Sequence, residues 1–292
     1  MRTRNIISAI AAAAVAFSAV SFSVSAEEEP AGYIYFMADK TTIGQGFAVE
    51  PEKVPFYEGE TGLEVVERAA DVLTDDTGYG AYITAFADAD LETEVPEAIK
   101  AVVPEMTGRN TEGYLSALDY TAESGWTYFV NDEYAQVGIG DYVPADGDVV
   151  VFSFTVYGYG ADLGVDNSSW GGAAALKEAT KKAGLVKLCA EAADADVDEY
   201  VFTGAMEVLA QYEATQEDID NAAAGLTAAL NSTAEAAATE DTADSTAEVS
   251  DDASAGTDTG KGSPSTGVEG AAVAFAVVLL AGAGIALSKK KY

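Results

Sequence analysis

The chain of 292 residues carries a formal net charge of −34 at pH 7, contains no histidine and has a single cysteine. This charge argues against a nucleic-acid partner, because phosphate binding needs a basic surface. The absence of histidine removes the commonest general base and the commonest metal ligand. The one cysteine, Cys189, excludes an intramolecular disulfide and is predicted to be a small buried side chain of a helix.

Residues 1–26 have the pattern of a secretory signal peptide. Arg2 and Arg4 supply the basic start, residues 6–20 are apolar, and the small residues that end at Ala26 predict cleavage after Ala26. An uncleaved membrane anchor is the alternative. The pattern therefore predicts a secreted protein.

Residues 27–160 predict one α+β domain. Strands are expected over 33–38 and 81–86, with an irregular edge strand that contains prolines within 45–58. An antiparallel sheet with a helix packed on one face would bury the apolar surface of both elements. This is the fold class that we expect.

The helix of this domain has a clear start. Thr61 and Glu64 can form a capping box, in which each side chain satisfies a free backbone N–H. Apolar residues then recur at helical spacing as far as Leu73. A second, short helix is expected over 96–103, with proline at its start.

The acidic residues Asp88, Asp90, Glu92 and Glu94 alternate with other residues. This pattern suggests calcium binding, but it lacks the glycine turn and the ligand loop of an EF-hand. We interpret the segment as a solvated acidic loop, with a metal site as the alternative.

Two runs of aromatic and β-branched residues, 124–131 and 146–157, predict a pair of antiparallel strands at the centre of the domain. In the first run, Trp126, Tyr128 and Val130 share one face. In the second run, alternate residues make a fully apolar face. Turn signals such as Asn-Asp and Asp-Gly flank the strands.

The sequence of these two strands resembles that of a known domain. The pattern Gly-Trp-x-Tyr-x-Val-Asn at 125–131, followed by Gly-Asp-x-Val at 147–150, resembles the transcobalamin-C-terminal-like domain, a bacterial domain of unknown function. That domain is similar to the β-domain of the vitamin B12 carriers transcobalamin and intrinsic factor. The resemblance covers about 32–157 and implies a ligand-binding sheet, with a corrinoid as one possible ligand.

The candidate ligand-binding residues are Trp126, Tyr128, Asn131 and Tyr134. Aromatic faces stack on sugars or on flat apolar ligands, and their polar tips add hydrogen bonds. The alternative for Trp126 is a core side chain, because its row could meet the helix that ends near Leu73. A glycan is the second ligand class that this surface would fit.

The chemistry of an enzyme is not indicated. The sequence has no Gly-x-Ser-x-Gly, no phosphate-binding loop and no cluster with metal-ligand spacing. A glycosidase with two carboxylates remains open in principle. We therefore expect a protein that is not an enzyme, with no catalytic residue, no cofactor and no metal.

A glycine-rich linker is predicted at 161–172, followed by a three-helix module at 173–232. The expected helices cover 173–193 and 197–212, and Thr215 can cap the third. The sequences at 214–220 and 226–230 resemble the FIVAR module of cell-wall proteins. The linker predicts that the module folds separately from the sheet.

Residues 233–262 are rich in Ala, Thr, Ser, Asp and Glu without periodicity, which predicts a disordered acidic stalk. The next pentapeptide is Ser263, Pro264, Ser265, Thr266 and Gly267. An apolar run at 271–287 and three lysines at 289–291 follow it.

The segment 263–292 resembles the Leu-Pro-x-Thr-Gly sorting signal of Gram-positive surface proteins, with Ser263 in place of Leu. The resemblance implies that a sortase cuts after Thr266 and joins it to peptidoglycan. Before sorting, 271–287 would hold the chain in the membrane. A plain transmembrane anchor is the alternative.

The order of these segments predicts a cell-wall-anchored bacterial surface protein with a transcobalamin-like module that binds a corrinoid or another extracellular small molecule. The alternative is a structural or adhesive protein. It would contact glycans, host proteins or wall polymers and would have no small-molecule ligand.

Overall fold

A computed structural model describes residues 29–76, 80–90 and 93–243. The predicted signal peptide with its cleavage site at Ala26, the sorting signal at 263–292 and most of the predicted stalk lie outside these ranges. The described chain is an α+β protein with two sheets and five α-helices. Within these ranges, no helix has the length and apolarity needed to cross a membrane.

The larger sheet has five strands in the order β2-β1-β8-β6-β7. Their bounds are β1 Gly32–Asp39, β2 Phe47–Phe56, β6 Gly125–Val130, β7 Glu133–Tyr134 and β8 Val149–Thr155. The prediction that the two aromatic strands pair antiparallel is confirmed, with Tyr128 opposite Phe152. The prediction of a wholly antiparallel sheet is wrong, because β1 pairs parallel with β8. A parallel pair needs a long crossover, and here the second sheet lies on that connection.

The second sheet has three antiparallel strands in the order β3-β4-β5. Their bounds are β3 Val72–Asp76, β4 Ala81–Ala87 and β5 Tyr114–Ser116. Helix α1, Gly62–Ala69, begins with the predicted capping box of Thr61 and Glu64. It ends earlier than predicted, because Ala70 is already extended and Leu73 belongs to β3.

One apolar core lies between the larger sheet, the second sheet and α1. Phe36 of β1 and Phe152 of β8 meet Phe86 of β4, with ring centroids 6.3 and 5.3 Å from Phe86. Val65 and Val66 of α1 are fully buried in the same cluster. The short helix α2, Glu97–Lys100, follows Pro96 as predicted and ends before the predicted residue 103.

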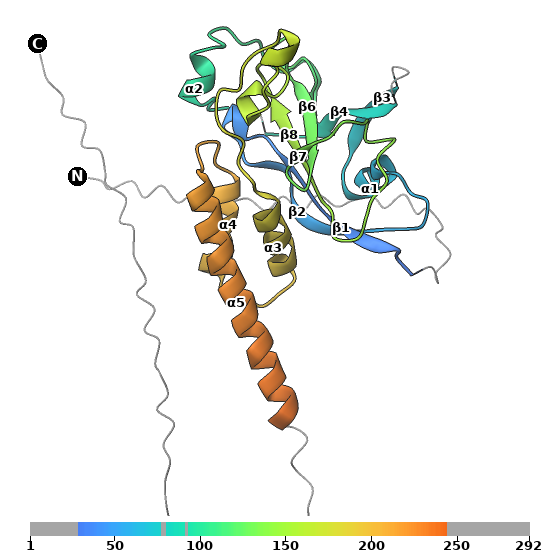
Figure 1. Ribbon diagram of the computed structural model, residues 1–292, viewed down its shortest axis with the longest axis vertical. Helices are drawn as coiled ribbons and strands as arrows, with labels where there is room; N and C mark the ends of the chain where they lie inside the picture. Colours follow the sequence, from blue (N-terminus) through green and yellow to red (C-terminus); the bar gives the residue numbers. More distant parts are fainter. Residues whose placement is uncertain (1–28, 77–79, 91–92, 244–292) are drawn as a thin grey trace, which may run out of the picture. The chain divides into compact units, whose positions relative to one another are not determined.

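Three helices cover the other face of the larger sheet, drawn in gold to orange in Figure 1. They are α3 Ala183–Ala193, α4 Glu199–Leu209 and α5 Gln216–Ala243. Thr215 caps α5 as predicted, since its hydroxyl accepts the N–H of Asp218 at 3.2 Å. The helix predicted over 173–193 begins only at Ala183. The stalk predicted from 233 is helical as far as Ala243, because α5 continues through it.

The helices share a hydrophobic core with the sheet. Met37 and Val151 of the sheet belong to one buried cluster with Val186, Cys189 and Leu226 of the helices. This arrangement contradicts the expectation of a separately packed module. Cys189 is buried as predicted, and burial raises the pKa of its thiol to about 12.

The predicted linker is instead an ordered loop with two 3-10 turns, Ala161–Leu163, whose first two residues are buried, and Ser168–Trp170, which is exposed. The Asn167 side chain donates to the carbonyl of Gly158 at 2.8 Å. Gly164 has a φ of +99°, and a Cβ there would lie 2.6 Å from the backbone of Ala179. The loop is therefore fastened to the segment after β8 and to the segment that leads into α3.

The predicted solvated acidic loop is wrong for Asp88. Its carboxylate is buried, 2.9 Å from the Lys40 ammonium and 2.7 Å from the Arg109 guanidinium. All three side chains are at most 8% exposed. Two cations that share one carboxylate tie this segment to the end of β1.

Candidate functional site

An aromatic cleft of about 180 Å³ opens beside β6, between the two sheets. Its lining comes from β4, β6, β7, β8 and the segment after β7. The lining residues are Tyr82, Ile83, Trp126, Thr127, Tyr128, Tyr134, Ala135, Val137, Gly138, Ile139 and Phe152. Trp126, Tyr128 and Tyr134 are three of the four residues that the sequence proposed for ligand binding. We refer to this feature as the aromatic cleft.

Trp126 is half-buried at the inner wall of the aromatic cleft. Its ring centroid lies 4.6 Å from that of Phe86 and 5.3 Å from that of Phe154. The indole Nε1 donates a hydrogen bond of 2.8 Å to the carbonyl of Leu115. Trp126 is thus fixed by packing and by one polar contact, while part of its surface lines the cleft.

Tyr128 forms the floor of the aromatic cleft. Its ring stacks on Phe152 at 5.1 Å with an interplanar angle of 16°. The hydroxyl donates to the carbonyl of Val137 at 2.6 Å, which fixes the segment after β7 across the strand. Burial, with a smaller contribution from the charge of Asp141, raises the pKa of Tyr128 to about 12.

Tyr134 and Asn131 occupy the β6–β7 hairpin. Tyr134 is 42% exposed at the rim of the cleft, and its ring packs edge-on against Phe129 at 5.8 Å. Asn131 does not line the cleft. Its side chain donates to Asp148 at 2.8 Å and accepts the N–H of Val149 at 2.9 Å. The carboxamide is thus used to join the hairpin to the start of β8.

The hairpin turn also reaches the helices. Asn131 and Asp132 both have positive φ, 52° and 67°. The Asp132 carboxylate accepts the backbone N–H groups of Lys182 and Ala183, each at 2.8 Å. Asp132 therefore caps the start of α3 from a distant strand.

Three further residues line the cleft and were not predicted from the sequence: Tyr82, Val137 and Ile139. Tyr82 comes from β4, and Val137 and Ile139 follow the hairpin. Val137 is 52% exposed, and Ile139 is buried. No local pattern marks these residues, because only the packing of β4 and of the segment after β7 around β6 brings them to the cleft.

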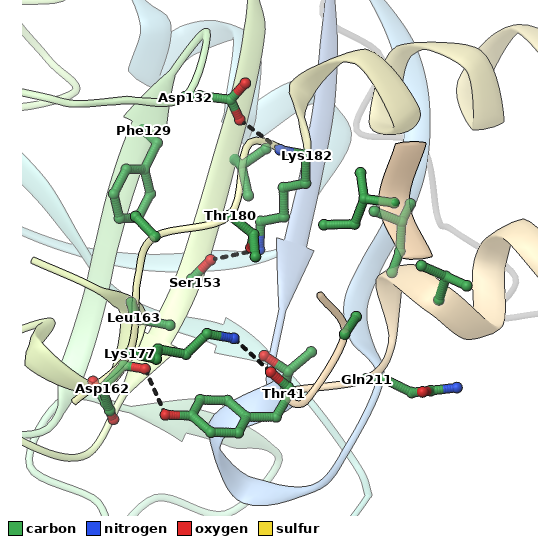
Figure 2. A pocket seen from close by; sticks show the side chains of 17 residues that line it. Thr41, Phe129, Asp132, Ser153, Asp162, Leu163, Lys177, Thr180, Lys182 and Gln211 are labelled. Carbon is green, nitrogen blue, oxygen red and sulfur yellow. Dashed lines mark hydrogen bonds between the residues drawn. The ribbon is translucent and has the colours of Figure 1, made fainter. Parts of the chain in front are cut away.

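A second, smaller cavity of about 60 Å³ lies between the larger sheet and the helices (Figure 2). The Lys182 ammonium lies 2.5 Å from Asp39 and 3.3 Å from Ser153. Asp39 is fully buried, and its carboxylate also accepts the hydroxyl of Ser153 at 2.7 Å. These polar groups satisfy one another within the core.

Asp162 and Lys177 line the same cavity. The Asp162 carboxylate accepts the Thr155 hydroxyl at 2.5 Å and the Val156 N–H at 2.8 Å. Burial raises the pKa of Asp162 to about 6, although these bonds oppose the shift. Lys177 donates to the carbonyl of Tyr212 at 2.6 Å, and burial lowers its pKa. The small volume and the internal bonds give this cavity a structural role.

In the ranges that the structure describes, no group of three or more acidic or cysteine side chains is arranged to hold a metal ion. A family model described as a domain of unknown function, DUF4430, matches residues 104–156. The match spans β5 to β8 and so includes most of the aromatic cleft. No curated protein matches the chain.

Proposed function

We propose that the protein is a non-enzymatic binding protein of the bacterial surface, and that the aromatic cleft holds a small-molecule ligand. The single observation behind this proposal is the position of the cleft. It lies along Trp126 and Tyr128, within the stretch that resembles the transcobalamin-like domain. The DUF4430 match covers residues 104–156 of that stretch, including Trp126 and Tyr128, and this family is associated with transcobalamin-like domains.

The size of the cleft limits the ligand. Pockets that enclose drug-sized molecules usually measure about 300–1,000 Å³, whereas this cleft measures about 180 Å³. A corrinoid would place an edge or a side group in the cleft and lie across the exposed side chains at the rim. Tyr82, Tyr134 and Val137 are those side chains, at 38%, 42% and 52% exposure.

Calorimetry of the purified full chain with cobalamin and cobinamide tests the corrinoid. If the ligand is a corrinoid, we expect saturable heat, and Val137→Trp should weaken the binding at least about tenfold by filling the mouth. Val137 suits this purpose because only its backbone carbonyl bonds to Tyr128. The absence of heat with either corrinoid would remove corrinoids from the proposal.

A second candidate function is adhesion. Trp170 is 90% exposed and Tyr159 is 64% exposed on the loop that Asn167 fastens. Exposed tryptophans on ordered loops are favoured contact residues of interfaces and stack on sugars. A glycan array on the full chain tests this reading. Binding that Trp170→Ala removes would support adhesion, and an array without signal would count against a glycan.

We also propose that secretion follows cleavage after Ala26 and that a sortase joins Thr266 to peptidoglycan. Helices α3 to α5, which resemble the FIVAR module in sequence, would then hold the sheet above the wall. Fractionation of the native cells tests the anchor. The protein should be released by a muramidase in wild-type cells, and Thr266→Ala should move it to the membrane fraction. Release from the cytosol would contradict the proposed location.

A further inference from the structure

Carboxylates stand next to residues that line the aromatic cleft. Asp141 follows the lining segment, is exposed, and lies beside Gly80, where a Cβ would be 2.5 Å from its Oδ2. Asp75 accepts the hydroxyl of Tyr82 at 3.4 Å. Glu133 is exposed in β7, next to Tyr134. The lining residues include neither Lys nor Arg within the described part of the chain.

The pKa values of two tyrosines that line the cleft are raised first by burial and second by these carboxylates. The pKa of Tyr82 is raised by burial and by the charge of Asp75. The pKa of Tyr128 is raised by burial and by the charge of Asp141. Each phenol thus lies in a negative field, which disfavours phenolate and any other anion.

Aromatic rings attract cations through the negative faces of their π-systems. The cleft combines such rings with nearby carboxylates and an opening to solvent. An anionic group would be repelled by both the carboxylates and the ring faces. A cation bound there would be attracted by Asp75, which bonds to Tyr82, and by Asp141, whose charge acts on Tyr128.

We propose that the aromatic cleft recognises a compact alkylammonium group, such as a quaternary ammonium, carried by the ligand. This inference rests on the proposed function, since it names the chemical class that the same cleft accepts. The small volume of the cleft matches a head group better than a whole polycyclic ligand. The strongly acidic chain adds long-range attraction for such a ligand.

The test uses choline and its neutral isostere 3,3-dimethylbutan-1-ol. The chain has two tryptophans, so Trp126 is the one tryptophan left in the Trp170→Phe variant. Because Trp126 lines the cleft, its fluorescence then responds to a ligand bound there. Both probes are titrated into the full-length Trp170→Phe variant at low salt. We expect choline to change the Trp126 emission and to bind at least about fivefold more tightly than the isostere.

The carboxylate is tested in the same background with Asp141→Asn, and Glu199→Gln on α4 is the matched control. Asp141→Asn should weaken choline about two- to threefold, as expected for one exposed charge. It should leave the affinity for the isostere unchanged, and the control should change the affinity for neither probe. Salt should weaken choline binding and not that of the isostere.

Equal affinity for choline and the isostere would overturn the ammonium assignment and leave small-molecule binding in the cleft intact. Choline binding without a change in Trp126 emission would also overturn it, because the ligand would then lie elsewhere. If neither probe binds, the ammonium assignment fails, and the corrinoid titration still decides the proposed function separately.

Discussion

The two faces of the larger sheet bury different kinds of side chain. On one face, Phe36, Tyr128 and Phe152 pack against the second sheet and leave the aromatic cleft open beside them. On the other face, Asp39 and Ser153 stand among apolar residues and are covered by the helices. Polar groups are thus buried where the cover is complete, and aromatic surface is left accessible where it is not.

This difference separates structural groups from binding groups. A buried polar side chain is tolerated only with hydrogen-bonding partners, and Lys182, Ser153 and Thr41 supply them for Asp39. Aromatic side chains need no such partners and remain able to stack on a ligand. The helix face is therefore the part of the molecule where substitution should affect stability most.

The largest effect is expected from Lys182→Met. Loss of one partner from a buried ion pair costs about 3–5 kcal/mol, because the remaining charge stays buried. Asp39 is fully buried, so its carboxylate could not reach solvent. Urea unfolding should show this loss for Lys182→Met. Lys181→Met, an exposed neighbour, should change the free energy of unfolding by less than about 0.5 kcal/mol. Equal effects of the two variants would contradict the role of the ion pair.

Trp126→Ala should come next, with a loss of about 3 kcal/mol, at the low end of the range for buried aromatic residues. The indole packs on Phe86 and Phe154 and bonds to Leu115, but one side is open. Trp170→Ala is the matched control, because Trp170 is 90% exposed. Thermal unfolding of both variants is the measurement. A negligible shift for Trp126→Ala would place Trp126 outside the core.

Glu52 gives a pH-dependent prediction. Burial raises its pKa from 4.5 to about 7, and its Oε1 has no hydrogen-bond partner in the described structure. Because the folded-state pKa is raised, the contribution of Glu52 to stability is greatest below pH 4.5 and is lost as the pH rises through 7. Glu52→Gln should therefore stabilise the protein at pH 8 and have little effect at pH 4.

At pH 8, Glu52→Gln should raise the free energy of unfolding by about 1–2 kcal/mol. This is less than the value that the full pKa shift would give, because the side chain is only partly buried. Urea unfolding across this pH range checks it. Glu50→Gln, at an exposed position of the same strand, should leave the profile unchanged. A wild-type profile without a fall between pH 5 and 8 would contradict the assignment.

The smallest effect is expected from Asp132→Ala, which removes the cap that joins the hairpin to α3. Loss of an N-terminal cap costs about 1 kcal/mol. Asp132→Asn keeps an acceptor and tolerates the positive φ of this position, so it should retain most of the stability. Urea unfolding of both variants is the measurement. Equal free energies of unfolding for the two variants would mean that the bonds to Lys182 and Ala183 contribute nothing.

Local signals in the sequence predicted much of the fold. The capping box of α1 involves residues three apart, and the alternation of Trp126, Tyr128 and Val130 needs only the geometry of one strand. The parallel pairing of β1 with β8 was not predictable in this way, because it depends on the whole crossover between them. The start of α3 was missed for the same reason, since its cap comes from Asp132 in a distant hairpin.

The candidate site was predictable in part. The aromatic row of β6 identified Trp126 and Tyr128, but the opposite wall at Tyr82 required the position of a second sheet. The ion pair of Lys182 with Asp39 joins residues separated by 143 positions. No pattern along the chain reports such a contact, and the helical module was therefore expected to fold separately.

The central claim is that the ligand is held in the aromatic cleft and not by the exposed loop around Trp170. The most direct test is calorimetry of the wild type, Val137→Trp and Trp170→Ala, each titrated with the same ligand, chosen because it binds the wild type. We predict that Val137→Trp weakens binding at least about tenfold, as for loss of a central contact, while Trp170→Ala leaves the affinity unchanged. Binding that survives Val137→Trp and is lost in Trp170→Ala would contradict the claim and move the site to the loop.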